Sequence, residues 1–120
     1  MTFGEELKIF SSKYPYQEIL IDGVKVRYVL AGKKENRAVV FLNGLDMQEM
    51  RIRYVDALQE NYLALMIEYP LAWDTNRKMV EGLHALFDKL GLTKPVIIGG
   101  SDGGALAQLY ACRYPENVSA

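Results

Sequence analysis

The chain has 120 residues, half of them hydrophobic, and its 14 basic and 15 acidic residues leave a net charge of −1. This composition fits one globular unit over residues 1–120 and gives no electrostatic reason to expect nucleic acid or an anionic membrane as a partner. No stretch offers the roughly 18 uninterrupted apolar residues that a membrane-spanning helix needs. The N-terminus lacks the basic-then-apolar order of a secretory signal, and the single Cys112 can form no internal disulfide, so we expect a cytoplasmic location.

The first predicted elements are two β-strands, residues 17–21 and 24–30, separated by Asp22-Gly23. Asp-Gly between two β-rich runs is a strong hairpin signal, because both central positions of the turn need a positive φ. Residues 38–42 are continuously apolar, which is typical of a parallel strand covered on both faces.

Helices and strands alternate from there on. We expect a helix over about residues 47–61, a strand over 62–67, a helix over about 76–90, a strand over 95–98 and a helix over about 103–113. Asp46 and Asp74 are the expected caps of the first two helices, and Gly91 is the expected end of the second. The second helix has an apolar face made of Met79, Val80, Leu83, Leu86, Phe87 and Leu90.

The order of these elements predicts the fold class. Alternating strands and helices imply right-handed crossovers, which place parallel strands in one sheet and helices on both of its faces. We therefore expect an α/β fold with a mostly parallel sheet that opens with an antiparallel hairpin.

Residues 99–103 read Gly-Gly-Ser-Asp-Gly and match the pattern G-x-S-x-G. A strand is expected before this motif and a helix after it, which is the context that a nucleophile elbow requires. In such an elbow the chain turns so sharply that the serine is strained and its hydroxyl is exposed. The motif predicts Ser101 as a nucleophile and the N–H of Asp102 as an oxyanion-hole donor. The expected elbow glycines are Gly99, Gly103 and Gly104.

Two other interpretations of this glycine-rich turn stay open. Ser101 could merely cap the following helix, as serines at helix starts often do. The loop could also bind a phosphate at the helix N-terminus, although its spacing matches neither G-x-G-x-x-G nor the P-loop pattern with its lysine.

The second oxyanion donor in this architecture comes from the loop after the first parallel strand, which here begins with Asn43-Gly44. The best-placed N–H in that loop belongs to Leu45. An ordinary Asn-Gly turn is the competing interpretation.

Three further side chains have structural interpretations. Trp73 is expected in the core or lining a pocket, and Cys112 as a small buried residue. His84 lies at the edge of an apolar helix face, where we expect a packing or surface group and not a general base.

The order of hairpin, strand, Asn-Gly loop, helix, strand, helix and Gly-Gly-Ser-Asp-Gly-Gly elbow resembles the α/β-hydrolase superfamily across nearly the whole chain. The run Glu68-Tyr69-Pro70-Leu71-Ala72-Trp73-Asp74 looks closest to maspardin-like members, which place Tyr-Pro-x-x-Trp-Asp at the same point. Most relatives begin the oxyanion loop with His-Gly, where this chain has Asn-Gly.

The resemblance implies a serine hydrolase that acts on a carboxylic ester or a related small acyl substrate, with no metal and no cofactor. In the family, the catalytic triad continues after the serine with an acid and a histidine on later strands. Only Glu116 follows the elbow as an acidic residue beyond Asp102, and the sole histidine, His84, precedes it. We therefore expect residues 1–120 to be the N-terminal, nucleophile-bearing part of a single hydrolase domain, truncated after the elbow helix and inactive alone.

Two alternatives remain, a non-catalytic maspardin-like binding or scaffold protein and a degenerate fragment without a function of its own. Truncation also predicts that the strand around residues 96–98 is an exposed edge, because its neighbour in the family's sheet would follow Ala120. An exposed apolar edge is a template for pairing with another chain, so we expect self-association.

Overall fold

The computed structural model describes residues 2–44 and 47–119. All five strands begin and end within one residue of their predicted bounds. In chain order the elements are α1 (Phe3–Lys13), β1 (Gln17–Ile21), β2 (Val24–Ala31), β3 (Ala38–Leu42), the 3₁₀ helix η1 (Gln48–Arg51), α2 (Ile52–Leu58), β4 (Leu63–Glu68), α3 (Asn76–Lys89), β5 (Val96–Gly99), α4 (Asp102–Arg113) and the 3₁₀ helix η2 (Pro115–Asn117).

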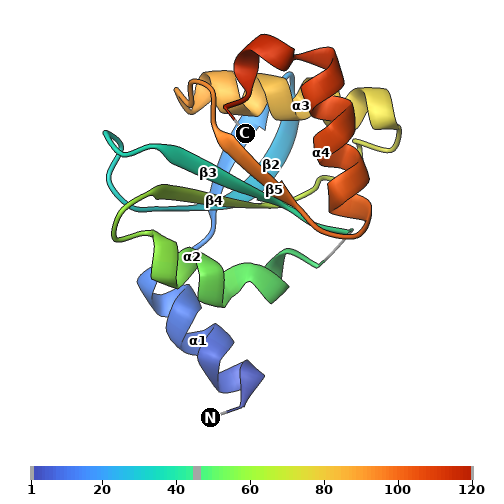
Figure 1. Cartoon of the computed structure of the whole chain (residues 1–120). Coiled ribbons are helices and arrows are strands. Elements are labelled where there is room, and N and C mark those ends of the chain that lie inside the picture. Colours follow the sequence, from blue (N-terminus) through green and yellow to red (C-terminus); the bar gives the residue numbers. More distant parts are fainter. Residues whose placement is uncertain (1, 45–46, 120) are drawn as a thin grey trace.

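The strands form one sheet in the order β1-β2-β4-β3-β5 (Figure 1). β2 pairs antiparallel with both β1 and β4, while β3 lies parallel to both β4 and β5. The α/β class and the opening antiparallel hairpin are thus confirmed. The hairpin turn has φ of 49° at Asp22 and 81° at Gly23, the positive values that the Asp-Gly signal predicts.

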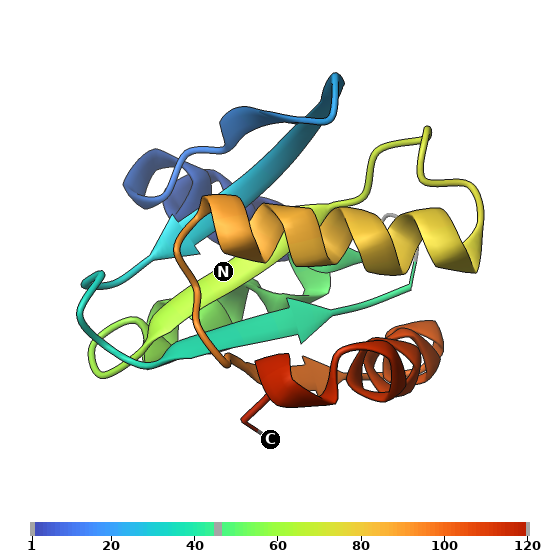
Figure 2. The same ribbon diagram turned by 90° about the horizontal axis from the view of Figure 1, so that it is seen from above.

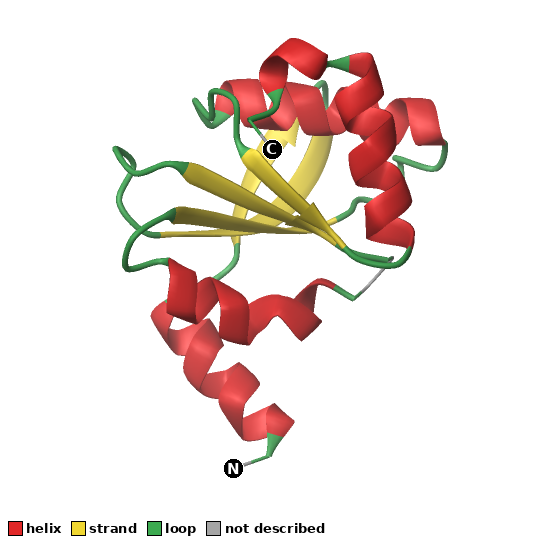
Figure 3. Cartoon of the chain, in the orientation of Figure 1, coloured by secondary structure: helices red, strands yellow, loops and turns green. Residues whose placement is uncertain are grey.

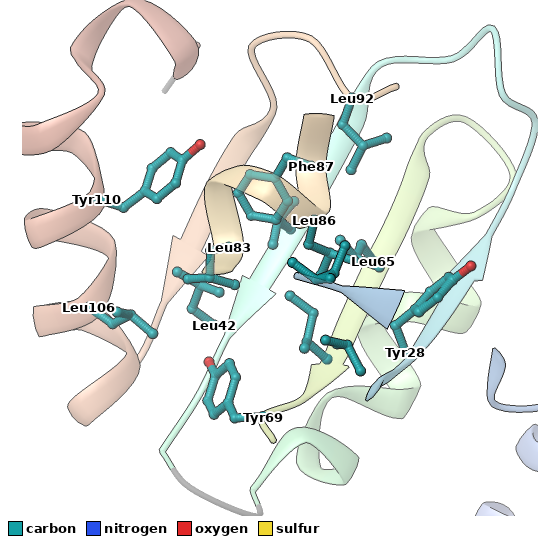
Figure 4. Close-up of a cluster of buried hydrophobic side chains, with 14 of the residues drawn as sticks. Tyr28, Leu42, Leu65, Tyr69, Leu83, Leu86, Phe87, Leu92, Leu106 and Tyr110 are labelled. Carbon is teal, nitrogen blue, oxygen red and sulfur yellow. The ribbon is translucent and has the colours of Figure 1, made fainter. Parts of the chain in front are cut away.

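Helices cover both faces of the sheet, with α1 and α2 on one side and α3 and α4 on the other (Figures 1, 2 and 3). β3 is buried along its whole length. It contributes side chains to the hydrophobic cores on both faces of the sheet, because successive side chains of a strand point to opposite faces. Val40 and Leu42 join the core under α3 and α4. Figure 4 shows Leu42 in this core, with Leu83 of α3 and Leu106 of α4. Val39 and Phe41 join the core under α1 and α2.

The predicted apolar face of α3 packs on the sheet. Its Val80, Leu83, Leu86 and Phe87 are buried, and Gly91 follows the helix with the positive φ of 73° that a helix-ending glycine adopts. Trp73 is buried in the same core. A methyl group at Gly82 of α3 would collide with the Trp73 ring, so the absence of a side chain there lets the indole lie against the helix.

The cap of α3 differs from the prediction. Thr75, and not Asp74, is the N-cap, and its Oγ1 accepts a 3.1 Å hydrogen bond from the N–H of Lys78. Asp74 instead accepts a 3.0 Å hydrogen bond from Nζ of Lys78. Thr75 has an extended backbone, with φ of −129° and ψ of 158°. From this conformation its side chain reaches the free N–H groups of the first helical turn.

Several other expectations were incomplete or wrong. The helix predicted over residues 47–61 is a 3₁₀ turn followed by a short α2 that ends at Leu58, and its predicted cap, Asp46, lies outside the described residues. Cys112 is exposed, because it lies on the side of α4 away from the core residues Leu106 and Tyr110. The expectation of an exposed edge around residues 96–98 is confirmed, since β5 is half-exposed and is the last strand in the sheet order.

The sequence interpretation also lacked α1. This helix begins at a Thr2 cap whose Oγ1 accepts a 3.1 Å hydrogen bond from the N–H of Glu5, and it buries Phe10 against the sheet. The spacing of Thr2 and Glu5 is a capping-box signal that could have identified the helix. In the part of the chain that the structure describes, no helix is long and apolar enough to cross a membrane.

Candidate active site

Ser101 lies at the turn between β5 and α4, with φ of 56° and ψ of −126°. L-residues rarely adopt this conformation, and holding a side chain there costs about 1–3 kcal/mol. The side chain is exposed, and it makes no capping hydrogen bond to the start of α4. The interpretation of Ser101 as an ordinary helix cap is therefore wrong. Among the described residues, the Ser101 hydroxyl therefore makes no capping hydrogen bond that would offset this strain.

Close packing of the two flanking segments explains two of the predicted elbow glycines. A methyl group at Gly103 would overlap the carbonyl group of Leu42 and stand 2.6 Å from the backbone nitrogen of Asn43. A methyl group at Gly99 would collide with the carbonyl oxygen of Gly103. At Gly104 the nearest atom would be 3.5 Å away, an ordinary contact, so packing does not require a glycine there.

The N–H of Asp102 is at the first position of α4, where no preceding turn of helix supplies an acceptor. The dipole of α4 adds partial positive charge at this end. Leu45, the other predicted oxyanion donor, lies outside the described residues. The two residues before it, Asn43 and Gly44, are at the same hollow as Ser101 and Asp102.

This hollow lies beyond the carboxyl ends of β3 and β5, the edge of a parallel sheet at which α/β proteins place their ligands. It has a volume of about 440 Å³. The residues that line it are Asn43, Gly44, Met47, Met50, Arg51, Gly100, Ser101 and Asp102. Among the described residues, its charged side chains are one guanidinium and one carboxylate, beside a strained serine.

Asn43 is buried, at 5% exposed, and two hydrogen bonds hold it in place. Its N–H donates a 2.9 Å hydrogen bond to the hydroxyl of Tyr69, and its Oδ1 accepts a 2.6 Å hydrogen bond from Nε of Arg51. Its Nδ2 has no hydrogen-bond partner within the described ranges 2–44 and 47–119. A buried donor left unpaired costs about 1–3 kcal/mol.

Tyr69 holds Asn43 at the start of the loop after β3, the predicted oxyanion loop, and the sequence interpretation gave it no role. Burial raises the pKa of Tyr69 to about 12, and the hydrogen bond from Asn43 opposes part of that rise. The phenol is therefore neutral at physiological pH and remains available as an acceptor. Arg51 was missed too, since neither its position in the chain nor a motif connects it with the elbow.

His84 is not at this hollow. Its Nδ1 lies 3.3 Å from the hydroxyl of Tyr110, and its ring stacks on Tyr114 with centroids 3.9 Å apart. His84 and Glu116 instead line a separate depression between α3 and α4. Among residues 2–44 and 47–119 there is accordingly no histidine beside Ser101, and no cluster of side chains suited to a metal ion.

Comparisons with known proteins agree with this architecture. The model of a family described as alpha/beta hydrolase fold matches residues 68–120. A Bacillus subtilis (strain 168) protein provisionally named 2-succinyl-6-hydroxy-2,4-cyclohexadiene-1-carboxylate synthase is 33% identical over 110 residues, 82% of this chain and 40% of that protein. Proline iminopeptidase PfmaB of Pestalotiopsis fici is 29% identical over 113 residues, again 82% of this chain and 40% of the relative. The chain thus spans about 40% of the length of these curated relatives.

Among solved structures, naproxen esterase (carboxylesterase NP) of Bacillus subtilis is similar, with a TM-score of 0.80 at 20% sequence identity. That match covers 98% of this chain and 46% of the esterase. The closer likeness to maspardin-like members stays a prediction. The sheet order, the helices on both faces and the matched family place this chain among the proteins of the α/β-hydrolase fold.

Proposed function

We propose that Ser101 is the nucleophile of an acyl-transfer hydrolase, and that this chain supplies the nucleophile and oxyanion part of the active site. The observation that carries the proposal is the conformation of Ser101, strained and with its hydroxyl exposed at a hollow between two strand ends. Strain of this kind persists where the surrounding structure imposes it, and it concentrates at functional sites.

In the proposed reaction, Oγ of Ser101 attacks the carbonyl carbon of an ester or a related acyl substrate while a base removes the hydroxyl proton. The N–H groups of Asp102 and Leu45 hold the negative oxygen of the tetrahedral intermediate. Collapse of the intermediate expels the alcohol, which takes the proton from the base, and leaves an acyl ester on Ser101. Water then hydrolyses that ester by the same steps. This chemistry requires neither a metal nor a cofactor.

The base is the missing component. His84 is engaged with Tyr110 and Tyr114, away from the hollow. A serine hydroxyl without a base is a poor nucleophile, so we propose that a histidine and an acid from outside residues 1–120 complete the triad, and that these 120 residues alone are inactive or nearly so. A non-catalytic maspardin-like binding or scaffold protein is the second candidate, and the observation that favours it is that no histidine lies beside Ser101 among the described residues.

The names of the relatives do not agree on a substrate. They describe a synthase of a cyclohexadiene carboxylate, a proline iminopeptidase and an esterase. We therefore propose a small acyl substrate as the class. A cytoplasmic location also stays a prediction.

A serine-directed fluorophosphonate probe tests the nucleophile. The probe is applied to the product of the full reading frame and to residues 1–120 alone, with Ser101→Ala and Ser12→Ala as matched variants. Ser12 is an exposed serine whose hydroxyl donates to the carbonyl of Lys8, so its loss controls for non-specific labelling. We expect labelling of the full product that disappears only in Ser101→Ala, and weak labelling of residues 1–120. A full product that is not labelled contradicts the hydrolase proposal and favours the binding protein.

We also propose that β5 mediates self-association. β5 is the last strand in the sheet order, and its Ile98 is 39% exposed. Free N–H and C=O groups beside apolar side chains form a template for another strand. Light scattering on residues 1–120 tests this, with Ile98→Lys as the variant that places a charge on the edge. A monomer at all concentrations contradicts the proposal.

A further inference from the structure

We propose that Arg51 binds a carboxylate carried by the acyl substrate, which makes Arg51 a specificity-determining residue for substrates with a second, anionic end. The inference rests on the proposed function of Ser101 and names the class of substrate for the same site. The Arg51 side chain belongs to η1 and yet lies against the elbow.

The guanidinium of Arg51 packs on the residue that precedes Ser101. A methyl group at Gly100 would collide with Nη2 of Arg51, so the glycine gives the guanidinium room to approach the backbone. Arg51 and Ser101 line the same hollow. The side chain is half-buried, and its Nε donates a 2.6 Å hydrogen bond to Oδ1 of Asn43. This bond fixes the position of the planar guanidinium group.

Most of the donors of Arg51 are unused. A guanidinium has five N–H groups, and within the described residues Arg51 uses only the one on Nε. Tyr54 offers no strong alternative, because its ring centroid is 5.9 Å from Cζ and its side chain is largely exposed. Four other arginines contact a carboxylate, namely Arg27, Arg53, Arg77 and Arg113. In the described part of the chain Arg51 has no such contact, although it is half-buried.

A second observation concerns Asn43. Its amide orientation follows from the hydrogen bond to Arg51, because only Oδ1 can accept from Nε. That orientation leaves the buried Nδ2 without a partner among the residues described. Among the described residues, the pair therefore holds the guanidinium at the hollow at the expense of an amide nitrogen without a hydrogen-bond partner. A contact with only a structural role does not explain why a buried amide donor is left without a partner. A role in positioning the charge of Arg51 for a ligand does explain it.

The chemistry of the free donors indicates the ligand. The terminal nitrogens of a guanidinium form a fork that matches the two oxygens of a carboxylate, and such charge-assisted pairs are the strong ones. Among the described residues, the second charged group at the hollow is Asp102, which is exposed, and its Oδ2 is 3.8 Å from the position that a methyl at Gly44 would take. An anionic substrate is thus repelled from the Gly44 side and attracted to the Arg51 side. Half-esters of small dicarboxylic acids fit this description.

Boronic acids test the inference, because they add reversibly to an active-site serine and can carry a carboxylate. The dissociation constants of phenylboronic acid and 3-carboxyphenylboronic acid are measured by calorimetry on the product of the full reading frame. We expect the carboxylated probe to bind roughly tenfold more tightly. In Arg51→Gln the affinity for 3-carboxyphenylboronic acid should fall about tenfold more than the affinity for phenylboronic acid, so that the preference is lost. Arg53→Gln, which removes an exposed arginine that pairs with Glu6, should keep the preference.

Three results would overturn the proposal. The wild-type protein could show no preference, Arg51→Gln could keep the preference, or Arg51→Gln could weaken both probes equally, which would mean that Arg51 acts on the oxyanion or on the fold. Arg51→Lys serves as a second variant if Arg51→Gln does not melt cooperatively. It should keep part of the preference, because it keeps the charge and loses the fork.

A titration that needs no nucleophile separates this inference from the proposed function. If neither boronic acid binds, the role of Ser101 fails. The anion site is then decided by adding benzoate, with benzamide as the neutral control, and following the backbone amide signals of Gly44 and Gly100 by NMR. Shifts caused by benzoate alone, and lost in Arg51→Gln, support the site. Their absence in the wild type rejects it.

Discussion

The N–H of Asn43 donates a 2.9 Å hydrogen bond to the hydroxyl of Tyr69, and each of these residues directly follows the carboxyl end of one of two neighbouring parallel strands. The bond joins the start of the proposed oxyanion loop, after β3, to the segment after β4. Both residues are buried, at 5% and 7% exposed. Tyr69 therefore holds the start of this loop in place from the segment after the neighbouring strand.

The first prediction concerns Tyr69→Phe. The substitution leaves the buried N–H of Asn43 without its acceptor, and we expect the free energy of unfolding to fall by about 1–3 kcal/mol. Urea denaturation measures the change. Tyr62→Phe is the matched control, because Tyr62 is 37% exposed and its hydroxyl makes no side-chain hydrogen bond among the described residues. Equal stability losses in the two variants would show that the hydrogen bond to Asn43 contributes nothing.

The second prediction is a loss of stability at alkaline pH. Burial raises the pKa of Tyr69 from 10.0 to about 12 in the folded protein. Between these values the unfolded chain gives up the phenol proton first, so the free energy of unfolding falls as the pH rises. The stabilisation is complete below pH ~10 and lost by pH ~12, a change on the order of 2–3 kcal/mol for Tyr69.

Tyr110 contributes to the same loss of stability at alkaline pH, since burial also raises the pKa of Tyr110 to about 12. The difference between wild type and Tyr69→Phe isolates the share of Tyr69. Denaturation curves at several pH values from 9 to 12 should show a shallower decline in the variant. Parallel curves for the two proteins would mean that the Tyr69 phenol ionises as it does in the unfolded chain.

The features that the sequence predicted correctly are those written in short, local patterns. The Asp22-Gly23 hairpin, the buried strand of residues 38–42 and the helix with Gly91 after it each depend on neighbours in the chain. The turn at Ser101 belongs to this group as well, because its strand, glycines and helix are consecutive. Such signals act through backbone conformation and periodicity, which sequence reveals directly.

The contacts that shape the candidate site are different in kind. Arg51 and Asn43 belong to the same connection between β3 and α2, but Arg51 meets Gly100, and Tyr69 meets Asn43, only after the sheet has brought separate loops together. No residue spacing records such a meeting. Short or weakly amphipathic helices were also misjudged. The predicted helix after β3 is split and ends early, and Cys112 faces solvent because the apolar pattern of α4, rich in alanine, does not define one buried face.

The third prediction compares two adjacent glycines of α4. Gly103→Ala places a methyl group on the carbonyl of Leu42, a backbone atom that cannot move aside, so we expect a loss of about 3 kcal/mol or more. Gly104→Ala meets nothing closer than 3.5 Å, and alanine favours a helix by about 0.5–1 kcal/mol over glycine. This variant should be as stable as the wild type or more so. Thermal unfolding of both proteins checks the contrast, and similar melting temperatures would contradict the packing at Gly103.

The fourth prediction separates backbone strain from chemistry at Ser101. Its φ of 56° and ψ of −126° suit glycine, which has no Cβ to clash with the backbone. Ser101→Gly should therefore raise the melting temperature, with a net gain of about 1 kcal/mol after the greater entropy of an unfolded glycine is subtracted. Ser101→Ala keeps the Cβ and hence the strain, so its stability should remain near that of the wild type. Both variants lose the hydroxyl and should lose fluorophosphonate labelling alike. If Ser101→Ala and Ser101→Gly raise the melting temperature equally, the stabilisation comes from removing the hydroxyl. The backbone at this turn is then not strained.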